Sequence, residues 1–406
     1  MAEELSGAAI RQRIDALAAI SAQADGLTRV YLSPEHRRAN ALVSGWMREA
    51  GMSVRVDAVG NVAGRYAGHD AAAPALLLGS HLDSVADAGR WDGPLGVVSA
   101  IACVASLHAA GRRLPCPVEV VGFADEEGTR FGATMLGSRG LAGTFDRAAL
   151  AIRDAQGIAM AQAMRDWGLD PDRIDDAARP PGSHAGYLEL HIEQGPVLEQ
   201  LGLATGCVSA IAGATRLRVT LAGEAGHAGT VPMRLRHDAL AAAAACILAI
   251  EGRAGEETDA VATVGRLDVS PGAVNVIPGG VAFTVDIRAP RDAQRHRLVT
   301  DIRRGIATLC GPRGVGHEIA VTHELDATPC APWLMARIDD AIGRRPATRL
   351  ASGAGHDGMA LRGLCDIGMI FVRCAGGISH NPAESVTDAD AEAGARVLMR
   401  VIESFA

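Results

Sequence analysis

Five short segments of this chain carry histidine and carboxylate side chains in the pattern of a metal site. They are Gly79-Ser80-His81-Leu82-Asp83, Trp91-Asp92-Gly93, Ala124-Asp125-Glu126-Glu127-Gly128, His191-Ile192-Glu193-Gln194-Gly195 and Ser379-His380-Asn381-Pro382. Divalent metals in proteins take imidazole nitrogen and carboxylate oxygen as ligands. Two such ions lie roughly 3.5–4 Å apart when one carboxylate bridges them. The five segments together therefore predict a two-metal centre for hydrolysis.

The candidate ligands divide between the two ions. Asp92 is the natural bridge, because its two carboxylate oxygens can reach two metals. We expect His81 and His191 to hold one ion, and Glu127 and His380 to hold the other. A water shared between the ions would have a lowered pKa and would act as the nucleophile.

Two further acids are expected to support this chemistry. Glu126 and Glu127 are adjacent, and successive side chains of an extended segment point apart, so one can bind metal while the other acts as general base. Asp83 lies two residues after His81, on the same side of a strand. Its carboxylate could hydrogen-bond the imidazole and orient it.

Several other kinds of chemistry are excluded by what the sequence lacks. No Gly-x-Ser-x-Gly elbow occurs, and no Gly-x-Gly-x-x-Gly follows the first expected strand. All 39 basic residues are arginine, which excludes a Schiff-base lysine and a Walker loop. The eight cysteines form no Cys-x-x-Cys pair, which is typical of buried thiols in a reducing compartment.

Charge and hydropathy limit the partners. The net charge of −8 argues against nucleic acid. The longest apolar run, from Ala239 to Ile250, is shorter than the roughly 20 residues of a membrane span. The first residues are acidic and lack the basic segment of a signal peptide. We expect a cytoplasmic protein with neither nucleic acid nor a membrane as its partner.

Short apolar strands alternate with helical stretches up to about residue 210, and this alternation predicts an α/β layer with a largely parallel sheet. The expected strands cover 76–79, 118–124 and 187–191, and the expected helix covers 95–110. Ligands of such sheets bind beyond the carboxyl ends of the strands. The segments that carry the candidate histidines and carboxylates lie at the carboxyl ends of these expected strands.

A second unit is expected to be inserted into the first. Residues 212–327 show the order β-α-β-β-α-β of a split βαβ sandwich, with expected strands at 216–221, 260–268, 281–288 and 317–324. Helices are expected at 238–250 and 292–309. The first unit resumes at 328–406, with a helix at 332–342, a strand at 367–372 and a closing helix at 388–405. We therefore expect two domains, one of residues 1–211 and 328–406 and one of residues 212–327.

With these motifs in their order, almost the whole chain resembles the hydantoinase/carbamoylase branch of the dinuclear-metal M20 peptidase superfamily. That branch includes N-carbamoyl-L-amino acid hydrolases, allantoate amidohydrolases, ureidoglycolate hydrolases and β-ureidopropionases. The resemblance implies a catalytic α/β domain with a mixed sheet flanked by helices, and an inserted α+β lid and dimerisation domain. It also implies a homodimer with two divalent ions per subunit, with Zn²⁺ or Mn²⁺ favoured and Co²⁺ or Ni²⁺ able to suit the same ligands.

The resemblance also implies a role for each residue of the centre. It assigns metal binding to His81, Asp92, Glu127, His191 and His380. It makes Asp92 the bridge and Glu126 the general base. His191 stands where the peptidase relatives usually carry an acid, which favours carbamoyl or ureido substrates over peptides.

Residues outside the metal segments are implied to meet the substrate. Ala225-Gly226-His227-Ala228-Gly229-Thr230 resembles the segment whose histidine enters the partner subunit's site and stabilises the oxyanion. Asn275 and Arg288 resemble residues that grip the substrate carboxylate. Gln194 is expected to contact the substrate, and Gly355 lies in a loop expected near it.

The function that follows is hydrolysis of a ureido carbon–nitrogen bond with release of ammonia and carbon dioxide. Asp87-Ala88-Gly89 and the segment from Phe371 to His380 look most like allantoate amidohydrolases, whereas Ala214 departs from the expected longer polar residue. The alternatives are an N-carbamoyl-L-amino acid hydrolase, a β-ureidopropionase, a ureidoglycolate hydrolase, and a dipeptidase or deacylase. A non-catalytic, metal-stabilised binding protein is the alternative outside enzymes.

Overall fold

A computed structural model describes residues 5–344 and 346–406, which fold into two compact units. The larger contains the chain up to Ser209 together with Cys330–Leu350 and Ala354–Ala406. The smaller contains Ala210–Pro329 and Ala351–Gly353. The first four residues, on which the signal-peptide expectation rests, lie outside the described part. Within that part, no helix combines the length and apolar character needed to cross a membrane.

The larger sheet is mixed and has nine strands, in the order β1-β2-β4-β3-β5-β16-β6-β14, with β15 paired to β6. The strands are β1 (Ser53–Val56), β2 (Val62–Tyr66), β3 (Ala75–His81), β4 (Val118–Phe123), β5 (His184–Ile192), β6 (Thr205–Ile211), β14 (Thr328–Pro329), β15 (Arg349–Ser352) and β16 (Ile367–Val372). The central strands β4, β3, β5 and β16 run parallel, whereas β2 pairs antiparallel with β1 and β4, and β6 pairs antiparallel with β16 and β14. The predicted α/β class with a mixed sheet is confirmed.

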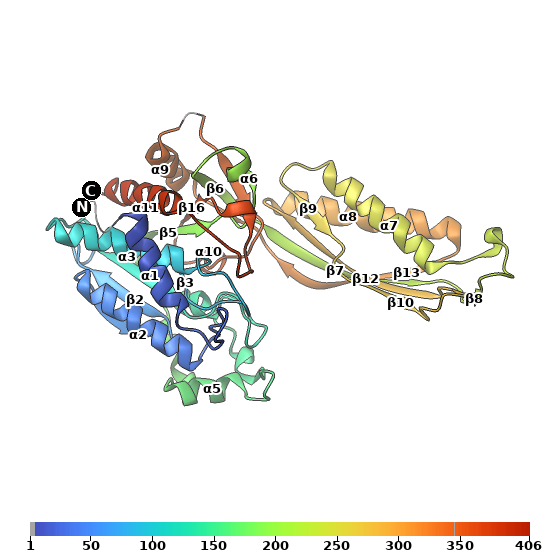
Figure 1. The fold of residues 1–406 in the computed structure, drawn as a ribbon, viewed down its shortest axis with the longest axis horizontal. Helices are drawn as coiled ribbons and strands as arrows, with labels where there is room; N and C mark the ends of the chain where they lie inside the picture. Colours follow the sequence, from blue (N-terminus) through green and yellow to red (C-terminus); the bar gives the residue numbers. More distant parts are fainter. Residues whose placement is uncertain (1–4, 345) are drawn as a thin grey trace. The chain divides into compact units, whose positions relative to one another are not determined.

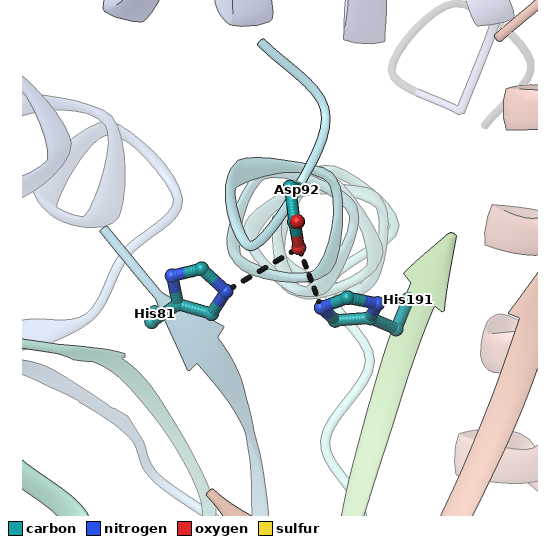
Figure 2. A group of neighbouring side chains, drawn as sticks. All are labelled: His81, Asp92 and His191. Carbon is teal, nitrogen blue, oxygen red and sulfur yellow. Dashed lines mark ion pairs between the residues drawn. The ribbon is translucent and has the colours of Figure 1, made fainter. Parts of the chain in front are cut away.

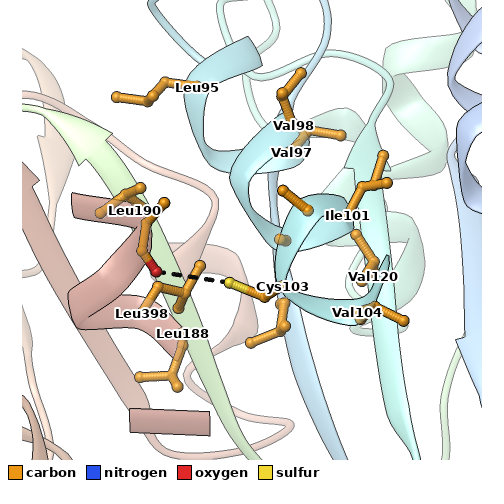
Figure 3. Close-up of a cluster of buried hydrophobic side chains, with 14 of the residues drawn as sticks. Leu95, Val97, Val98, Ile101, Cys103, Val104, Val120, Leu188, Leu190 and Leu398 are labelled. Carbon is orange, nitrogen blue, oxygen red and sulfur yellow. Dashed lines mark hydrogen bonds between the residues drawn. The ribbon is translucent and has the colours of Figure 1, made fainter. Parts of the chain in front are cut away.

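Helices cover both sides of this central sheet and bury its apolar strands (Figure 1). The helices of the larger unit are α1 (Gly7–Ala18), α2 (Pro34–Glu49), α3 (Pro94–Ala109), α4 (Leu136–Leu141), α5 (Met160–Trp167), α6 (Val197–Gln200), α9 (Pro332–Ile342), α10 (Gly358–Leu361) and α11 (Asp388–Glu403), with short 3₁₀ turns at Arg147–Ala151, Pro171–Ala177 and Ala375–Gly377. α3 is apolar almost all round because it packs against the sheet on one side and α1 and α11 on the other. Figure 3 shows part of this core, where side chains of α3 lie among those of β4, β5 and α11. This packing holds the N-terminal end of α3, which follows Asp92, against the sheet.

The smaller unit is an antiparallel sheet with two helices packed on one face (Figure 1). Its elements are β7 (Gly213–Ala222), β8 (Gly226–His227), α7 (Ala239–Gly255), β9 (Val261–Thr263), β10 (Leu267–Ser270), β11 (Val276–Ile277), β12 (Gly280–Ala289), α8 (Asp292–Cys310) and β13 (Gly316–Leu325), with 3₁₀ turns at Met233–Leu235 and Gly311–Arg313. Buried residues alternate along β7 and β12, as expected where one face of a sheet meets a core and the other does not. β8 and β11 form a separate two-stranded ribbon.

One expected strand of the smaller unit is wrong. The sequence predicted a continuous strand over 260–268, but β9 and β10 are separate, and both pair with β12. The interruption falls at 264–266, around Gly265, whose missing side chain gives nothing to pack. One hydrogen bond, from the N–H of Thr284 to the carbonyl of Arg266, continues the contact with β12 across the break.

Candidate metal centre

Two buried histidines and one buried aspartate from three different elements meet in the larger unit (Figure 2). His81 ends β3, His191 lies near the end of the neighbouring strand β5, and Asp92 lies in the loop before α3. Oδ1 of Asp92 is 3.0 Å from Nε2 of His191 and 3.5 Å from Nε2 of His81. Because β3 and β5 run parallel, their carboxyl ends bring both imidazoles to the same edge of the sheet.

Gly93 makes this close approach possible. Its φ of +83° lies in the left-handed region, which residues with a Cβ rarely adopt. A Cβ at this position would lie 2.6 Å from Cε1 of His81. A larger residue would therefore push Asp92 and α3 away from the histidine.

Hydrogen bonds fix which nitrogen of each histidine faces Asp92. Nδ1 of His81 lies 3.1 Å from the backbone carbonyl of Asp83, and Nδ1 of His191 lies 2.9 Å from that of Ile192. A carbonyl oxygen can only accept, so in the neutral ring Nδ1 carries the proton and Nε2 presents its lone pair to Asp92. Nε2 of His191 is buried and has no hydrogen-bond partner among the described residues. Two lone pairs beside a carboxylate oxygen are unfavourable unless a cation lies among them, so this donor set fits a divalent metal.

A second group forms around the other oxygen of Asp92. Nε2 of His380 lies 3.3 Å from Oδ2 of Asp92 and 3.4 Å from Oε1 of Glu127. One donor atom from each of these three residues lies within 4.8 Å of the other two, as it also does for His81, Asp92 and His191. The bridging residue and the two pairs expected from the sequence are therefore placed as two adjoining groups that share Asp92.

The electrostatics of the two groups favour a cation. Burial alone would raise the pKa of Asp92, but the close imidazoles of His191, His380 and His81 outweigh it and hold that pKa well below the usual range. Burial alone would lower the pKa of His81, but Asp83 and Asp92 raise it well above the usual value. Protons and metal ions thus compete for the same nitrogen atoms, as is general for metal sites.

Asp83 anchors the two glutamates rather than the imidazole. Its Oδ1 accepts the N–H of Glu126 at 2.9 Å, and its Oδ2 accepts the N–H of Glu127 at 3.1 Å. The sequence predicted a hydrogen bond from the imidazole of His81 to this carboxylate, but Oδ1 lies 3.5 Å from Nδ1 and the backbone carbonyl of Asp83 is the partner. β3 ends at His81, so Asp83 no longer follows the alternation of a strand.

Glu126 and Glu127 lie in a bend after β4, close to one another. One oxygen of each lies within 4.8 Å of a ring nitrogen of His81. Burial raises the pKa of Glu126 well above its usual range, opposed by the charge of His81 and reinforced by that of Glu127. Burial likewise raises the pKa of Glu127 to about 7. A Cβ at Gly355 would lie 3.7 Å from Oε1 of Glu126, so the glycine leaves that side of the carboxylate without a side chain.

Two residues that were not among the candidates predicted from the sequence, Ser379 and Glu384, form hydrogen bonds with Asp92. Glu384 is buried, and its Oε1 accepts the N–H groups of Trp91 at 2.7 Å and Asp92 at 3.1 Å. The Ser379 hydroxyl lies 2.9 Å from Oδ2 of Asp92. Gln194, expected at the substrate, donates to the same Oδ2 at 2.8 Å. Ser379 directly precedes His380, and Glu384 follows it by four positions. This proximity to a candidate ligand is the feature of the sequence that could have indicated them.

A further buried cluster lies next to His191. The ring of His356 packs edge-on against that of His191, with 4.5 Å between the centroids. Burial lowers the pKa of His356 well below its usual value, and the charge of His191 lowers it further. The carboxylate of Glu189 lies near both rings and accepts the Ser80 hydroxyl at 2.7 Å.

Three of the residues expected at the substrate lie in the smaller unit. His227 on β8 is exposed, and its Nδ1 accepts the N–H of Gly229 at 3.0 Å, which leaves the proton on Nε2. Asn275 lies beside it, with its carbonyl accepting the N–H of Ala228 at 3.0 Å. Arg288 lies near the far end of β12 and binds Asp286 through Nε and Nη2 and the carbonyl of Gly353 through Nη1.

The smaller unit does not bring these three residues together. The segment with His227 and Asn275 adjoins the Gly280 end of β12, where Gly279 contacts Ala225. At about 3.3 Å per residue, Arg288 lies on the order of 25 Å further along the strand.

Comparison with known proteins gives consistent matches over the length of the chain. The model of peptidase family M20/M25/M40 matches residues 77–404. The N-carbamoyl-L-amino acid amidohydrolase of Geobacillus stearothermophilus is 44% identical over 99% of both chains. The allantoate deiminase of Arabidopsis thaliana is 40% identical over 97% of this chain and 81% of its own length. The crystal structure of a hydantoinase/carbamoylase family amidase from Burkholderia multivorans is 33% identical, with a TM-score of 0.91 over 98% of both chains.

Proposed function

Because this chain belongs to peptidase family M20/M25/M40, in its hydantoinase/carbamoylase branch, we propose that it uses two divalent metals to cleave the ureido or carbamoyl bond of a small carboxylate substrate. It is an amidohydrolase acting on carbon–nitrogen bonds other than peptide bonds. The observation that carries the two-metal proposal is the pair of adjoining donor groups that share Asp92. His81 and His191 would hold one ion, Glu127 and His380 the other, and Asp92 both.

Glu126 is proposed as the proton carrier. When bound, the two cations would acidify the attacking water and polarise the carbonyl of the substrate. The carboxylate of Glu126 takes one proton from this water and returns it to the leaving nitrogen when the carbon–nitrogen bond breaks. Hydrolysis of one ureido group consumes one water and gives an amine, ammonia and carbon dioxide. Asp83 keeps Glu126 in place through the backbone, with its Oδ1 on the N–H of that residue.

The residues of the smaller unit are proposed to bind the substrate. Nε2 of His227 carries a proton and can donate to the oxyanion that develops on the carbonyl. Arg288 pairs Nε and Nη2 with Asp286 and gives one N–H of Nη1 to the carbonyl of Gly353, so the second N–H groups of Nη1 and Nη2 would meet the substrate carboxylate. We place Asn275 beside the same carboxylate from the chain that supplies His227, and Gln194 and Gly355 around the ureido group.

We further propose that two copies of the chain complete each site. His227 and Arg288 lie on the order of 25 Å apart within one smaller unit, so one chain alone cannot place both on a small substrate. A homodimer in which each smaller unit, acting as a lid, lends His227 to its partner would resolve this. Residues 212–327 would then be a lid and dimerisation domain, and residues 1–211 and 328–406 the catalytic domain.

Allantoate is the substrate we propose first, and an N-carbamoyl-L-amino acid is the second candidate. The segments around Asp87 and Phe371 support allantoate. The 44% identity with the Geobacillus relative, over nearly all of both chains, supports the second candidate. The two share a carboxylate and a terminal ureido group, so the same catalytic residues serve either.

The test is ammonia release by protein that has been stripped with a chelator and reloaded with Mn²⁺. Allantoate and several N-carbamoyl-L-amino acids are offered side by side, with unloaded protein as the control. Release only from the loaded protein with allantoate is the expected result. Release only from carbamoyl amino acids would move the substrate to the second candidate, and absence of ammonia with both would contradict the proposed function.

A further inference from the structure

One oxygen of Asp92 has more hydrogen-bond donors than a metal ligand should have. Oδ2 receives the amide Nε2 of Gln194 at 2.8 Å and the hydroxyl of Ser379 at 2.9 Å. The same oxygen lies 3.3 Å from Nε2 of His380, on the side of the second ion group. A cation and a hydrogen-bond donor compete for the lone pairs of one oxygen. Oδ2 can serve the second ion well only if these donors have somewhere else to go.

Each of the two donors has a second acceptor within reach. Nε2 of Gln194 also lies 3.2 Å from Oγ of Ser379. Oγ of Ser379 also lies 3.1 Å from Oε2 of Glu384. A hydroxyl has only one proton, so Ser379 can donate to Asp92 or to Glu384 but not to both. If it donates to Glu384, its oxygen is free to accept from Gln194, and both donors leave Oδ2.

Glu384 is held so that only one of its oxygens can take this hydroxyl. Its side chain is buried, and Oε1 already accepts the N–H groups of Trp91 and Asp92. Gly89 packs directly on it, since a Cβ there would lie 2.3 Å from the Cβ of Glu384. Oε2 is therefore fixed toward Ser379, and the same carboxylate fixes the backbone of the bridging residue.

We propose that Ser379 and Glu384 are positioning residues that release Asp92 for the second cation. In this relay Gln194 donates to Ser379 and Ser379 donates to Glu384, which is the final acceptor. Without the cation, Gln194 and Ser379 donate to Oδ2 of Asp92. When the cation is bound, Gln194 donates to Ser379 and Ser379 donates to Glu384. The inference rests on the proposed two-metal function and adds the device that frees the bridging ligand.

The relay makes a specific prediction for Glu384→Gln. The amide oxygen must face the two backbone N–H groups, because an amide nitrogen cannot accept them. The amide nitrogen then faces Ser379 and donates to its oxygen. Ser379 can no longer donate to residue 384, so its proton stays on Asp92 and opposes the second cation. Removing both donors in the triple variant Glu384→Gln/Ser379→Ala/Gln194→Leu removes this opposition, because Ser379→Ala alone would leave Gln194 on Oδ2 without its second acceptor.

The experiment is a titration of metal-free protein with Mn²⁺ alone, followed by calorimetry and by metal analysis after dialysis. Co²⁺ absorption of the same proteins reports the coordination of each ion. We expect the natural sequence to bind two ions, and Glu384→Gln to keep the first while binding the second at least about tenfold more weakly. The triple variant, which lacks both donors, should recover second-ion affinity to within about threefold of the natural sequence.

Asp154→Asn is the matched control, because Asp154 is a buried carboxylate that accepts two backbone N–H groups in another loop. It should bind both ions normally. Recovery by further substitutions separates the relay from a loss of folding, since removing more side chains does not repair a misfolded loop. Undiminished second-ion binding by Glu384→Gln, or a triple variant as weak as the single one, would overturn the relay. If the natural sequence itself binds only one ion, the two-metal function fails as well.

Discussion

The proposed metal pocket of the larger unit and the proposed substrate residues of the smaller unit are built in opposite ways. His81, His191 and Asp92 are buried, and each is held by strand ends or by hydrogen bonds to the backbone. His227 and Asn275 are exposed on a two-stranded ribbon. The difference follows from what each set must bind. An ion needs donors that are already in place, whereas a substrate must first enter and can then be covered.

This contrast predicts that substitutions in the two units will have different signatures. Changes in the pocket should alter metal content, stability or the chemical step. Changes in the smaller unit should alter turnover or substrate affinity and leave metal binding as it was.

The largest effect is expected for Glu126→Gln. The amide cannot accept the proton of the attacking water, so kcat should fall by about 10³-fold. Metal content should stay at the natural level, as measured by metal analysis of the same sample. Glu127→Gln is the matched control and should instead lose metal. Turnover at the natural rate by Glu126→Gln would remove it from the mechanism.

His227→Ala should come next, with turnover about 10²-fold lower and unchanged metal binding. If the histidine acts in the partner subunit, mixing His227→Ala with Glu126→Gln chains should restore activity. Each mixed dimer has one intact site, so an equal mixture should reach roughly a quarter of the natural activity. Activity that stays at the level of the separate variants after subunit exchange would show that His227 serves its own chain or none.

A buried ionised carboxylate should also contribute more to the free energy of unfolding than an exposed one. Burial opposes ionisation of Glu119, but His184 and Arg179 outweigh it and lower its pKa from 4.5 to about 2. A lowered pKa stabilises the fold above the unfolded value and loses this contribution as the pH falls toward the folded one. Glu119→Gln should therefore cost about 3 kcal/mol near pH 7 and progressively less between pH 4.5 and 2.

Urea unfolding of the metal-free protein at several pH values measures this. Asp268→Asn in the smaller unit is the comparison, because Asp268 forms an exposed ion pair with Arg266 at 2.8 Å. It should change the free energy of unfolding far less at every pH. Equal costs for the two variants would contradict the contrast between the units.

The smallest effect is expected for Arg288→Lys. Lysine keeps the charge but loses the planar fork that can bind a carboxylate with two hydrogen bonds, so KM should rise about tenfold with little change in kcat. Arg216→Lys is the control, since Arg216 binds the same Asp286 at 2.9 Å and has no proposed substrate contact. Steady-state kinetics that change equally in both variants would indicate an effect on Asp286 rather than on the substrate.

The fold could be predicted where local pattern and tertiary structure agree. The helix over Pro332–Ile342 and the strand over Ile367–Val372 have the predicted bounds, because proline starts the helix and an unbroken apolar run forms the buried strand. The candidate ligands were recognisable because each follows such a strand or enters a turn with glycine. The break between β9 and β10 was missed, since both segments are apolar enough to extend one strand.

The hydrogen bonds around Asp92 could not be predicted in the same way. Glu384 reaches the N–H of Asp92 across 292 positions of sequence, and no periodic pattern encodes such an approach. The position of Asp83 was also missed in part, because the end of β3 at His81 decides whether its carbonyl or its carboxylate meets the imidazole. The residue types indicated which side chains could bind a metal. Their hydrogen-bond partners depend on the folded backbone and could not be predicted from the sequence.

The length of β12 has a consequence for how this enzyme can change over evolutionary time. It separates the segment of His227 from Arg288, and both lie outside the element ends that carry the metal ligands. Mutations that accumulate along the smaller unit can therefore alter selectivity while the hydrolytic machinery is inherited intact. A combinatorial library confined to the smaller unit, with His227 and Arg288 kept, would retain every proposed metal ligand, whereas one spread over β3 and β5 would replace His81 or His191 in most of its members.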